Sequence, residues 1–309
     1  MFVGRLRQAC SRGTKTRRWP FVSCCCYLPG RMAKLHSGKG DHLDRTKENT
    51  RQQILTEAVV ESICDLSPTV KSLSLRVNNE EFSFKAGQWV DFFIPELDGQ
   101  FTGFSMTSAP GQLEHDGILD LAVKCSEEAP AHWVHHKCQV GSKVRMRVGG
   151  DFNFDPQDGD QSKDLLLIAG GVGINPLYSI VQHVVDLHRV SLQRGETAYK
   201  PGRTVLLYSA RDEGELLFRE QILRLCQEVP DMSLQCFVTQ QQEFKNPSQF
   251  PRPKVGRITQ EVLKAELSGL HGDQTLSYIC GPPPMIESMA HHLSCLGVDS
   301  ANIKFEKWW

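Results

Sequence analysis

The stretch Leu165–Tyr178, which reads LLLIAGGVGINPLY, decides the fold of the second half of this 309-residue chain. Its first four residues form an apolar run, typical of a strand buried on both faces. The run leads into three glycines, Gly170, Gly171 and Gly173. Pro176 then stands where a helix can begin, and apolar residues follow at helical spacing. Glycine lets a backbone approach a phosphate, and helix starts favour anions, so the stretch predicts a phosphate cradle. A tight turn without a ligand is the alternative for the glycines alone.

The rest of the second half alternates between strand and helix patterns. The expected strands are 165–169, 204–208, 233–239, 276–280 and 302–306. The expected helices lie near 176–188, 214–228, 259–267 and 284–296, with surface loops at 191–202 and 244–254. Such alternation predicts a parallel sheet with helices on both faces. We therefore expect an α/β nucleotide-binding domain with a five-stranded parallel sheet at residues 164–309.

The first half shows short alternating segments separated by Gly and Pro turns. The clearest segments are 73–77, 89–94, 119–123 and 144–148. This spacing predicts a small antiparallel β-barrel over residues 54–156. The turn-forming stretch DPQDGDQSKD at 155–164 connects it to the second domain, and the polar residues 41–53 read as a linker.

Residues 1–40 contain nine Arg or Lys and no acid, which leaves 26 basic against 36 acidic residues in the remainder. An Arg-rich, acid-free leader before an acidic body favours a mitochondrial transit peptide. A disordered basic arm for nucleic acid or a membrane surface is the alternative, but a nucleic-acid-binding domain carries its positive charge on the folded body. No apolar run is long enough to span a bilayer.

Eleven cysteines argue for reduced thiols rather than a metal centre. Four lie in the leader, and the other seven are scattered with no C-x2-C pair. This pattern argues against structural zinc and against a plant-type iron–sulfur cluster. We expect no metal site.

Four motifs together resemble the ferredoxin-reductase-like flavoprotein family over residues 50–309. They are FSMTS at 104–108, the glycine turn, YICGPPPM at 278–285 and the terminal FEKWW at 305–309. The resemblance implies a flavin-type (FR-type) barrel followed by an NAD(P)-binding domain. It also implies an NAD(P)H oxidoreductase that passes hydride to a bound flavin and electrons to an unknown acceptor, either a small molecule or a protein.

In the flavin half, the resemblance implies that Phe104 stacks on the flavin and that the Ser105 hydroxyl reaches its reactive nitrogen. The chain has Thr102 where the family has a phosphate-binding Arg, and residues 129–135 lack the Gly and hydroxyl of the family's pyrophosphate motif. FAD is the expected flavin, and FMN, with fewer phosphate contacts, is the alternative. A further alternative is a non-catalytic mitochondrial NAD(H)-binding or assembly factor with a decayed flavin site.

In the nucleotide half, the resemblance implies a cofactor cradle and a catalytic pair. The cradle comprises Gly170, Gly171, Val172, Gly173, Ile174, Asn175, Pro176, Ser209, Arg211, Gly281 and Pro282. Cys280 would lie near the nicotinamide, with Glu306 as its polar partner. Trp308 and Trp309 would cover the flavin. Without the motif, Cys280 reads as a small buried hydrophobe.

The nicotinamide cofactor is expected to be NADH rather than NADPH. Arg211 follows the second strand, where the adenosine ribose is expected. Three acids, Asp212, Glu213 and Glu215, come next and would repel a 2′-phosphate. Arg211 either holds a phosphate or pairs with those acids.

Overall fold

The structure is a computed structural model that describes residues 42–43, 46–97, 100–244 and 251–307. The expected leader at 1–40 and the two terminal tryptophans, Trp308 and Trp309, lie outside these residues. Among the residues described, no helix is both long and apolar enough to cross a membrane.

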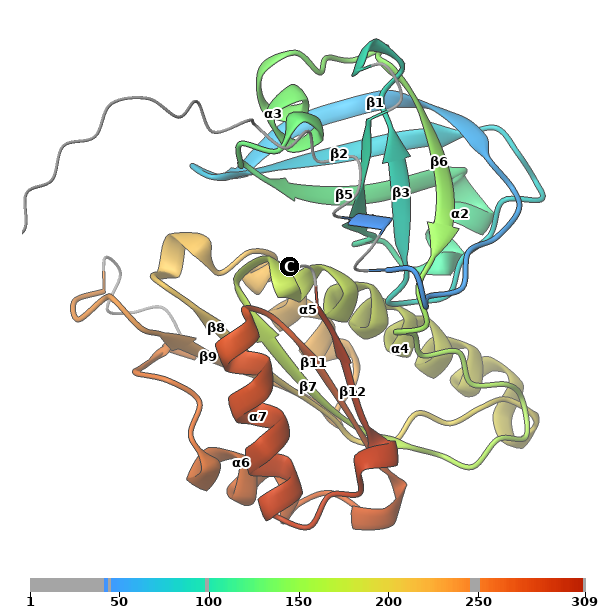
Figure 1. The fold of residues 1–309 in the computed structure, drawn as a ribbon. Coiled ribbons are helices and arrows are strands. Elements are labelled where there is room, and N and C mark those ends of the chain that lie inside the picture. The colour runs from blue at the N-terminus through green and yellow to red at the C-terminus, as the bar shows by residue number, and fades with distance from the viewer. Residues whose placement is uncertain (1–41, 44–45, 98–99, 245–250, 308–309) are drawn as a thin grey trace, which may run out of the picture. The chain divides into compact units, whose positions relative to one another are not determined.

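The first half is a six-stranded antiparallel sheet in the order β4-β3-β6-β1-β2-β5 (Figure 1). Its strands are β1 (Thr56–Ser67), β2 (Val70–Val77), β3 (Trp89–Phe93), β4 (Phe101–Ser105), β5 (Ile118–Lys124) and β6 (Lys143–Gly149). Helices α2 (Pro110–Asp116) and α3 (Ala129–His136) and the 3₁₀ turn η1 (Pro95–Leu97) lie in its connections. The bridge between Met106 and Leu121 joins the two edge strands, and Thr107 N donates to Asp120 O at 2.8 Å. The predicted antiparallel barrel is confirmed.

The second half is a parallel sheet in the order β10-β9-β8-β7-β11-β12. Its strands are β7 (Asp164–Gly170), β8 (Thr204–Ala210), β9 (Met232–Val238), β10 (Lys254–Val255), β11 (Thr275–Cys280) and β12 (Ile303–Glu306). Its helices are α4 (Ile174–Arg194), α5 (Arg219–Glu228), α6 (Gln260–Leu267) and α7 (Pro283–Cys295). Its 3₁₀ turns are η2 (Gly171–Gly173), η3 (Gly195–Thr197), η4 (Glu213–Glu215), η5 (Gly272–Gln274) and η6 (Ser300–Asn302).

The parallel sheet is confirmed, and all five expected strands form. A sixth strand, β10, adds two residues at the edge, where the stretch expected to be a loop ends. Two residues are too few to give an alternating pattern. Helix α4 also runs into the expected loop at 191–202, and it ends where Gly195 takes a φ of 65°.

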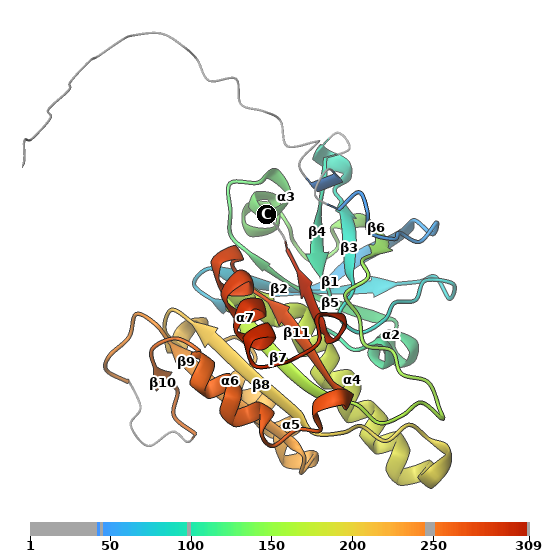
Figure 2. The same cartoon turned by 60° about the horizontal axis from the view of Figure 1, so that its bottom comes forward.

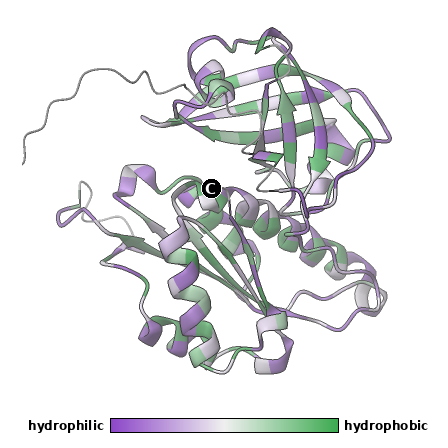
Figure 3. Cartoon of the chain, viewed as in Figure 1, coloured by the Kyte–Doolittle hydropathy of each residue, from purple (hydrophilic) through white to green (hydrophobic). Residues whose placement is uncertain are grey.

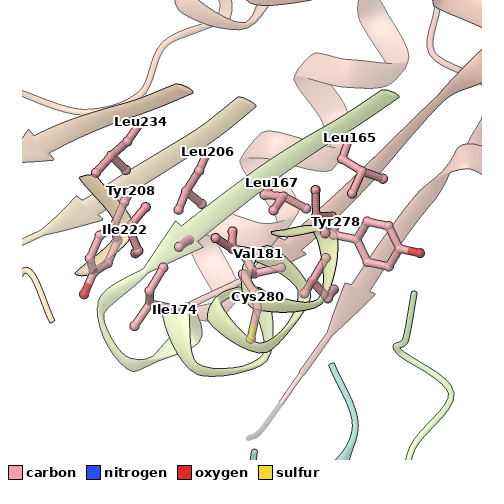
Figure 4. Packing of buried hydrophobic residues seen from close by; sticks show 14 of the residues in the cluster. Leu165, Leu167, Ile174, Val181, Leu206, Tyr208, Ile222, Leu234, Tyr278 and Cys280 are labelled. Atoms are coloured by element: carbon pink, nitrogen blue, oxygen red, sulfur yellow. The ribbon is translucent and has the colours of Figure 1, made fainter. Parts of the chain in front are cut away.

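Successive side chains of each central strand point to opposite faces of the sheet. Leu165 and Leu167 join the cluster that contains α4 and α5, whereas Leu166 and Ile168 join the cluster that contains α6 and α7. Figure 2 shows the two helix pairs on either side of the sheet, and Figure 3 shows hydrophobic residues concentrated along the central strands. Figure 4 shows the first cluster from close by. Burial on both faces explains why these strands read as continuous apolar runs.

Residues 46–52, expected to belong to a linker, are bound to the barrel. Gln52 N donates to Val148 O at 2.9 Å, and Gly150 N donates to Thr50 O at 3.0 Å. Arg51 lies over the Trp89 ring, 5.0 Å from its centroid. Polarity suggested a linker here, but these side chains find partners on β3 and β6.

The strongest of these partners is Asp91, a fully buried carboxylate on β3. It accepts from His42 Nε2 at 2.8 Å, from Arg51 Nε at 3.0 Å and from Arg147 Nη2 at 2.6 Å. Burial raises the pKa of this carboxyl, but the hydrogen bonds from the three partners outweigh burial and leave the pKa below its ordinary value. A lowered folded pKa stabilises the protein above the unfolded value, near 4, and that contribution is lost as pH falls through the folded pKa.

We predict that Asp91→Asn lowers the free energy of unfolding by about 3 kcal/mol, because two buried or half-buried arginines lose their counter-charge. The measurement is urea denaturation at pH 7. Asp65→Asn is the matched control, because its ion pair with Lys71 at 3.9 Å is exposed and should contribute less than about 1 kcal/mol. The difference between wild type and Asp91→Asn should shrink as pH falls below about 4. Equal losses for the two variants would contradict the role of Asp91.

Candidate dinucleotide-binding site

The strand order of the second sheet reverses between β7 and β11. From β7 the chain proceeds outward through β8, β9 and β10, then crosses back to place β11 on the other side of β7. In open α/β sheets, ligands bind at such a switch point, outside the carboxyl ends of the strands. The glycine turn after β7 and the Cys-Gly-Pro turn after β11 both lie there, so the structure brings the two predicted motifs together.

Three of the predicted glycines are required because these two turns touch. A Cβ on Gly173 would overlap the carbonyl of Cys280 and lie 2.7 Å from Gly281 N. A Cβ on Gly170 would lie 2.8 Å from Pro282 Cδ, and one on Gly281 would lie 3.0 Å from Gly170 Cα. These residues therefore allow close packing of the turns rather than direct approach of a ligand.

Gly171 has a different role. Its φ is +54°, and a Cβ built on it would meet nothing within 4 Å. It also lines a cavity of about 430 Å³ at the switch point. Of the four glycines, Gly171 is therefore the one at which the backbone offers open space to a ligand.

The cavity extends from the turns at 170–171 and 282–284 across the ends of β8 and β9. Among the predicted cofactor residues, it is lined by Gly170, Gly171, Ser209, Arg211 and Pro282. The cavity is also lined by residues that were not predicted to belong to the site: Thr239, Arg257, Ile258, Pro284, Met285, Ser288 and Met289. The barrel contributes Lys124. The hydroxyl of Ser288, on α7, lies 3.2 Å from His292 Nε2. In the sequence, only the i,i+4 spacing of these two residues on an expected helix indicates that their side chains meet.

Three exposed cations surround this cavity: Lys124, Arg211 and Arg257. None forms an ion pair with any residue in the described ranges. Among the described residues, Glu215 is the one carboxylate on the cavity wall, and it accepts from Thr69 Oγ1 at 2.8 Å. Asp212 accepts from Gly214 N at 3.0 Å. The ion-pair alternative for Arg211 is therefore not observed, and the cavity wall is electropositive.

The first turn of α4 is buried rather than open. Ile174 and Pro176 are buried, Val172 is partly buried against the core, and Asn175 donates from Nδ2 to Ala122 O of the barrel at 2.7 Å. Two further side chains of α4 continue this stripe. Ser179 Oγ donates to Ser108 O at 2.7 Å, and Gln182 Nε2 donates to Thr107 O at 2.6 Å. The structure thus places Asn175, predicted to bind cofactor, in a contact between α4 and β5.

Cys280 and Glu306, the predicted catalytic pair, are direct neighbours across β11 and β12. Cys280 is fully buried and lies on the α4 face of the sheet (Figure 4). Burial, and secondarily the Glu306 carboxylate, raises the pKa of the Cys280 thiol well above its ordinary value. The thiol is therefore protonated at neutral pH and is no nucleophile.

The predicted flavin residues lie on β4. Phe104 is partly exposed, with its ring 5.3 Å from that of Phe92 in an edge-on contact, and Ser105 is mostly buried. The Ser105 hydroxyl has no hydrogen bond to a residue of the described part of the chain. Thr102 Oγ1 lies 3.5 Å from Glu128 Oε2, just before α3. The place where the family has a phosphate-binding Arg therefore faces a carboxylate.

Comparison with known proteins agrees with this geometry. The family model of the oxidoreductase NAD-binding domain matches residues 167–291. Oxidoreductase NAD-binding domain-containing protein 1 of Danio rerio is 48% identical over 270 residues, covering 87% of this chain and 97% of that protein. The reductase component of phenol 2-monooxygenase from Pseudomonas sp. (strain CF600) is 31% identical over 273 residues, covering 86% of this chain and 68% of that protein.

Among solved structures, a ferredoxin NADP⁺ reductase from Neisseria gonorrhoeae with bound FAD and NADP has the same two-domain fold. Its TM-score is 0.63 at 21% identity, covering 84% of this chain and 100% of that chain. The resemblance expected from the sequence motifs is confirmed at the level of fold and family.

We predict opposite outcomes for alanine at two glycines of the turn. Gly173→Ala should lower the free energy of unfolding by about 3 kcal/mol, because the new Cβ drives the two turns apart. Gly171→Ala should cost only about 1–2 kcal/mol for its left-handed backbone but should weaken nucleotide binding. Urea denaturation and NADH titration would measure the two effects. Similar losses of stability in both variants would contradict the division of roles.

We also predict that Cys280 resists alkylation in the native protein. The exposed Cys64, Cys125 and Cys295 should react with iodoacetamide at pH 8, whereas Cys280 should react more than about 10-fold slower, because little thiolate forms. Peptide-resolved mass spectrometry would follow each site. Denaturation in urea should remove the difference, which serves as the control. Rapid labelling of native Cys280 would contradict its assignment as a buried thiol.

Proposed function

Because the chain belongs to the family of oxidoreductase NAD-binding domain-containing protein 1, we propose that it is an NAD(P)H-dependent flavin oxidoreductase that delivers electrons to an acceptor. The observation that carries this proposal is the electropositive cavity at the switch point of the nucleotide domain, to whose wall the barrel contributes Lys124 at the end of β5. The acceptor is left unspecified as a small molecule or a protein.

The cavity fits a nicotinamide dinucleotide. Gly171 offers unobstructed backbone, and the N-terminus of the 21-residue helix α4 follows directly. The first turn of α4 is buried, so the helix contributes the partial positive charge of its N-terminus rather than direct N–H contacts, and this charge favours a pyrophosphate. Lys124, Arg211 and Arg257 add full positive charges on the same cavity wall. These residues would hold and orient the dinucleotide.

The barrel fits the ring of a flavin better than the phosphates of FAD. Phe104 offers a partly exposed aromatic face, and the Ser105 hydroxyl, without a partner among the described residues, is available to hydrogen-bond a ring nitrogen. Glu128, beside Thr102, would repel a pyrophosphate at that point. A bound flavin would supply the redox chemistry: it would accept a hydride from dihydronicotinamide, and its reoxidation would pass two electrons to the acceptor and release the proton to solvent.

The residues of the chain position the reactants and exclude water. Packing of the two turns fixes Gly171 relative to Pro282 across the cavity. Cys280 and Glu306 lie at the ends of adjacent strands, so the proposal assigns them to orientation of the nicotinamide, with the thiol remaining protonated. The terminal Trp308 and Trp309 are proposed to cover the flavin.

We further propose that the protein works in mitochondria. The proposal rests on the basic, acid-free composition of residues 1–40. Import of a fluorescent protein fused to these 40 residues would test it, with a fusion whose arginines in 1–40 are replaced by glutamine as the control. Mitochondrial fluorescence that is unchanged in the control would contradict the assignment.

The deciding experiment is an absorption spectrum of the purified protein with added FAD or FMN, followed by anaerobic NADH or NADPH. We predict bound flavin that is bleached by the nicotinamide, with FMN retained at least as tightly as FAD. Ser105→Ala should slow bleaching roughly 100-fold while leaving nucleotide affinity unchanged, because it removes one preorganised hydrogen bond at the reacting ring.

Ser83→Ala is the matched control, since Ser83 is an exposed serine of the barrel domain away from β4. It should bleach at the wild-type rate. A protein that binds NADH yet refuses both flavins would contradict the enzyme assignment and leave a nucleotide-binding protein with no redox step of its own.

A further inference from the structure

We propose that the side-chain amine of Lys304, on β12, is a nucleophile that becomes acylated by thioesters carrying short acyl groups. Three features of the structure support this: the position of Lys304 between two cavities, the groups that hold its amine, and the lack of an ion pair. Lys304 takes no part in the proposed redox reaction, so its acylation is independent of that function.

Lys304 lies between two cavities outside the dinucleotide site. One, of about 360 Å³, is bounded by the connection between β6 and β7 and by Leu276 and Tyr278 of β11. The other, of about 460 Å³, is bounded by the polar stretch before β1, by Phe152 and by the last residues of β12. Among the described residues, Lys304 is the only one that lines both cavities. A short acyl group therefore has room on either side of the amine.

The Lys304 amine is held against Tyr278. The two residues are paired across β12 and β11, and Lys304 Nζ lies 5.2 Å from the centroid of the Tyr278 ring. Nζ also lies 3.3 Å from the Tyr278 hydroxyl oxygen, and this hydroxyl donates its own hydrogen to Asn153 O at 2.8 Å. The tyrosine oxygen therefore accepts a hydrogen from the amine. In the deprotonated amine, this contact leaves the nitrogen lone pair for an electrophile.

The smaller cavity provides no counter-charge for Lys304. No carboxylate forms an ion pair with this lysine among the residues that the structure describes. Of the two acids on the cavity wall, Asp155 pairs with Lys85 at 2.9 Å, and Asp160 accepts a main-chain N–H of its own turn at 2.8 Å. The remaining charged side chain of this wall, Lys163, is a second cation.

The larger cavity does not pair with the amine either. Asp151 accepts from Thr50 N at 3.2 Å, and Lys307 is another cation. Glu306 is mostly buried two residues further along β12, and no ion pair joins it to Lys304 in the described part of the chain. Burial therefore lowers the pKa of the Lys304 amine below its ordinary value. At neutral pH, more of this amine is the free base than in an exposed lysine.

The step assigned to Lys304 is aminolysis of a thioester. The free amine attacks the acyl carbon, so that a C–N bond forms and the C–S bond breaks. The thiolate leaves and takes up the proton that the nitrogen loses, and the products are an amide and a free thiol. Acylation also replaces a charge that burial disfavours with a neutral amide. The remaining N–H of this amide can keep the contact with the Tyr278 hydroxyl.

The test is the rate of acetylation at each lysine of the full chain, with S-acetyl-N-acetylcysteamine as the probe and peptide-resolved mass spectrometry as the readout. Near neutral pH, we expect Lys304 to react about 5-fold faster than Lys307, because a desolvated amine without an ion pair contains more free base. Lys307 is the internal control, since its Nζ also lies 5.2 Å from an aromatic centroid, that of Phe305, but its side chain is exposed. The ratio should fall as pH rises, because the rate at Lys304 stops increasing once its amine is deprotonated. Unfolding in urea should remove the difference.

Two variants that add the same charge separate this chemistry from simple accessibility. Asn153→Asp places a carboxylate on the wall of the smaller cavity and retains the main-chain oxygen that accepts from Tyr278. It should slow Lys304 about 3-fold relative to Lys307, because a nearby negative charge favours the ammonium form. Asn79→Asp adds its charge to the barrel, where it lines neither cavity, and should leave the ratio unchanged.

Equal rates at Lys304 and Lys307 in the native wild-type protein would overturn the proposal, and this comparison needs no variant. The same ratio in Asn153→Asp as in Asn79→Asp would also overturn it, because the reactivity would then not depend on the charge around the amine. A ratio that survives unfolding in urea would trace the difference to local sequence and contradict the role of the cavities.

Discussion

The close contact between two glycine turns is the constraint on which the nucleotide domain depends. Gly170, the last residue of β7, and Gly173, in the turn that follows, meet Gly281 after β11 with no room for a side chain between them. Strands β7 and β11 are adjacent, so this contact closes the switch point and aligns the end of β7 with the first turn of α4. This contact between the turns therefore sets the positions of the cavity, of Gly171 on its wall and of the start of α4. A glycine motif that looks like a ligand-binding loop is thus mainly a packing motif, with one position left for the ligand.

A second constraint is the buried charge of Asp91 in the barrel. A carboxylate without exposure is tolerated only when its lone pairs are filled, and here His42, Arg51 and Arg147 fill them. Two of these partners, His42 and Arg51, precede β1, so the polar stretch before the barrel is anchored to β3 through Asp91. Trp89 is covered in the same way, so the outer face of β3 is as buried as its inner face.

Much of the second domain could be predicted from sequence because strands buried on both faces leave unbroken apolar runs, as in Leu165–Ala169. The glycine turn and the Cys-Gly-Pro motif were likewise visible, and the structure places them side by side. Arg257 was missed because its relevance depends on β10, a two-residue strand with no pattern of its own. The role of Asn175 was also hidden, since an amide in a glycine turn gives no sign that its partner is a carbonyl of a distant strand.

The acids after Arg211 show the limit of reading charge from sequence alone. Their proximity along the chain suggested an ion pair with Arg211, yet Glu215 accepts a hydrogen bond from Thr69, nearly 150 residues away in sequence. The polar side chains of α4 that contact the barrel have a consequence for which substitutions the contact tolerates in evolution. Asn175, Ser179 and Gln182 all bond to main-chain carbonyls of the barrel, which every amino acid supplies. These three hydrogen bonds therefore depend on the side chains of the helix and on the backbone of the barrel, so only substitutions on the helix remove them directly.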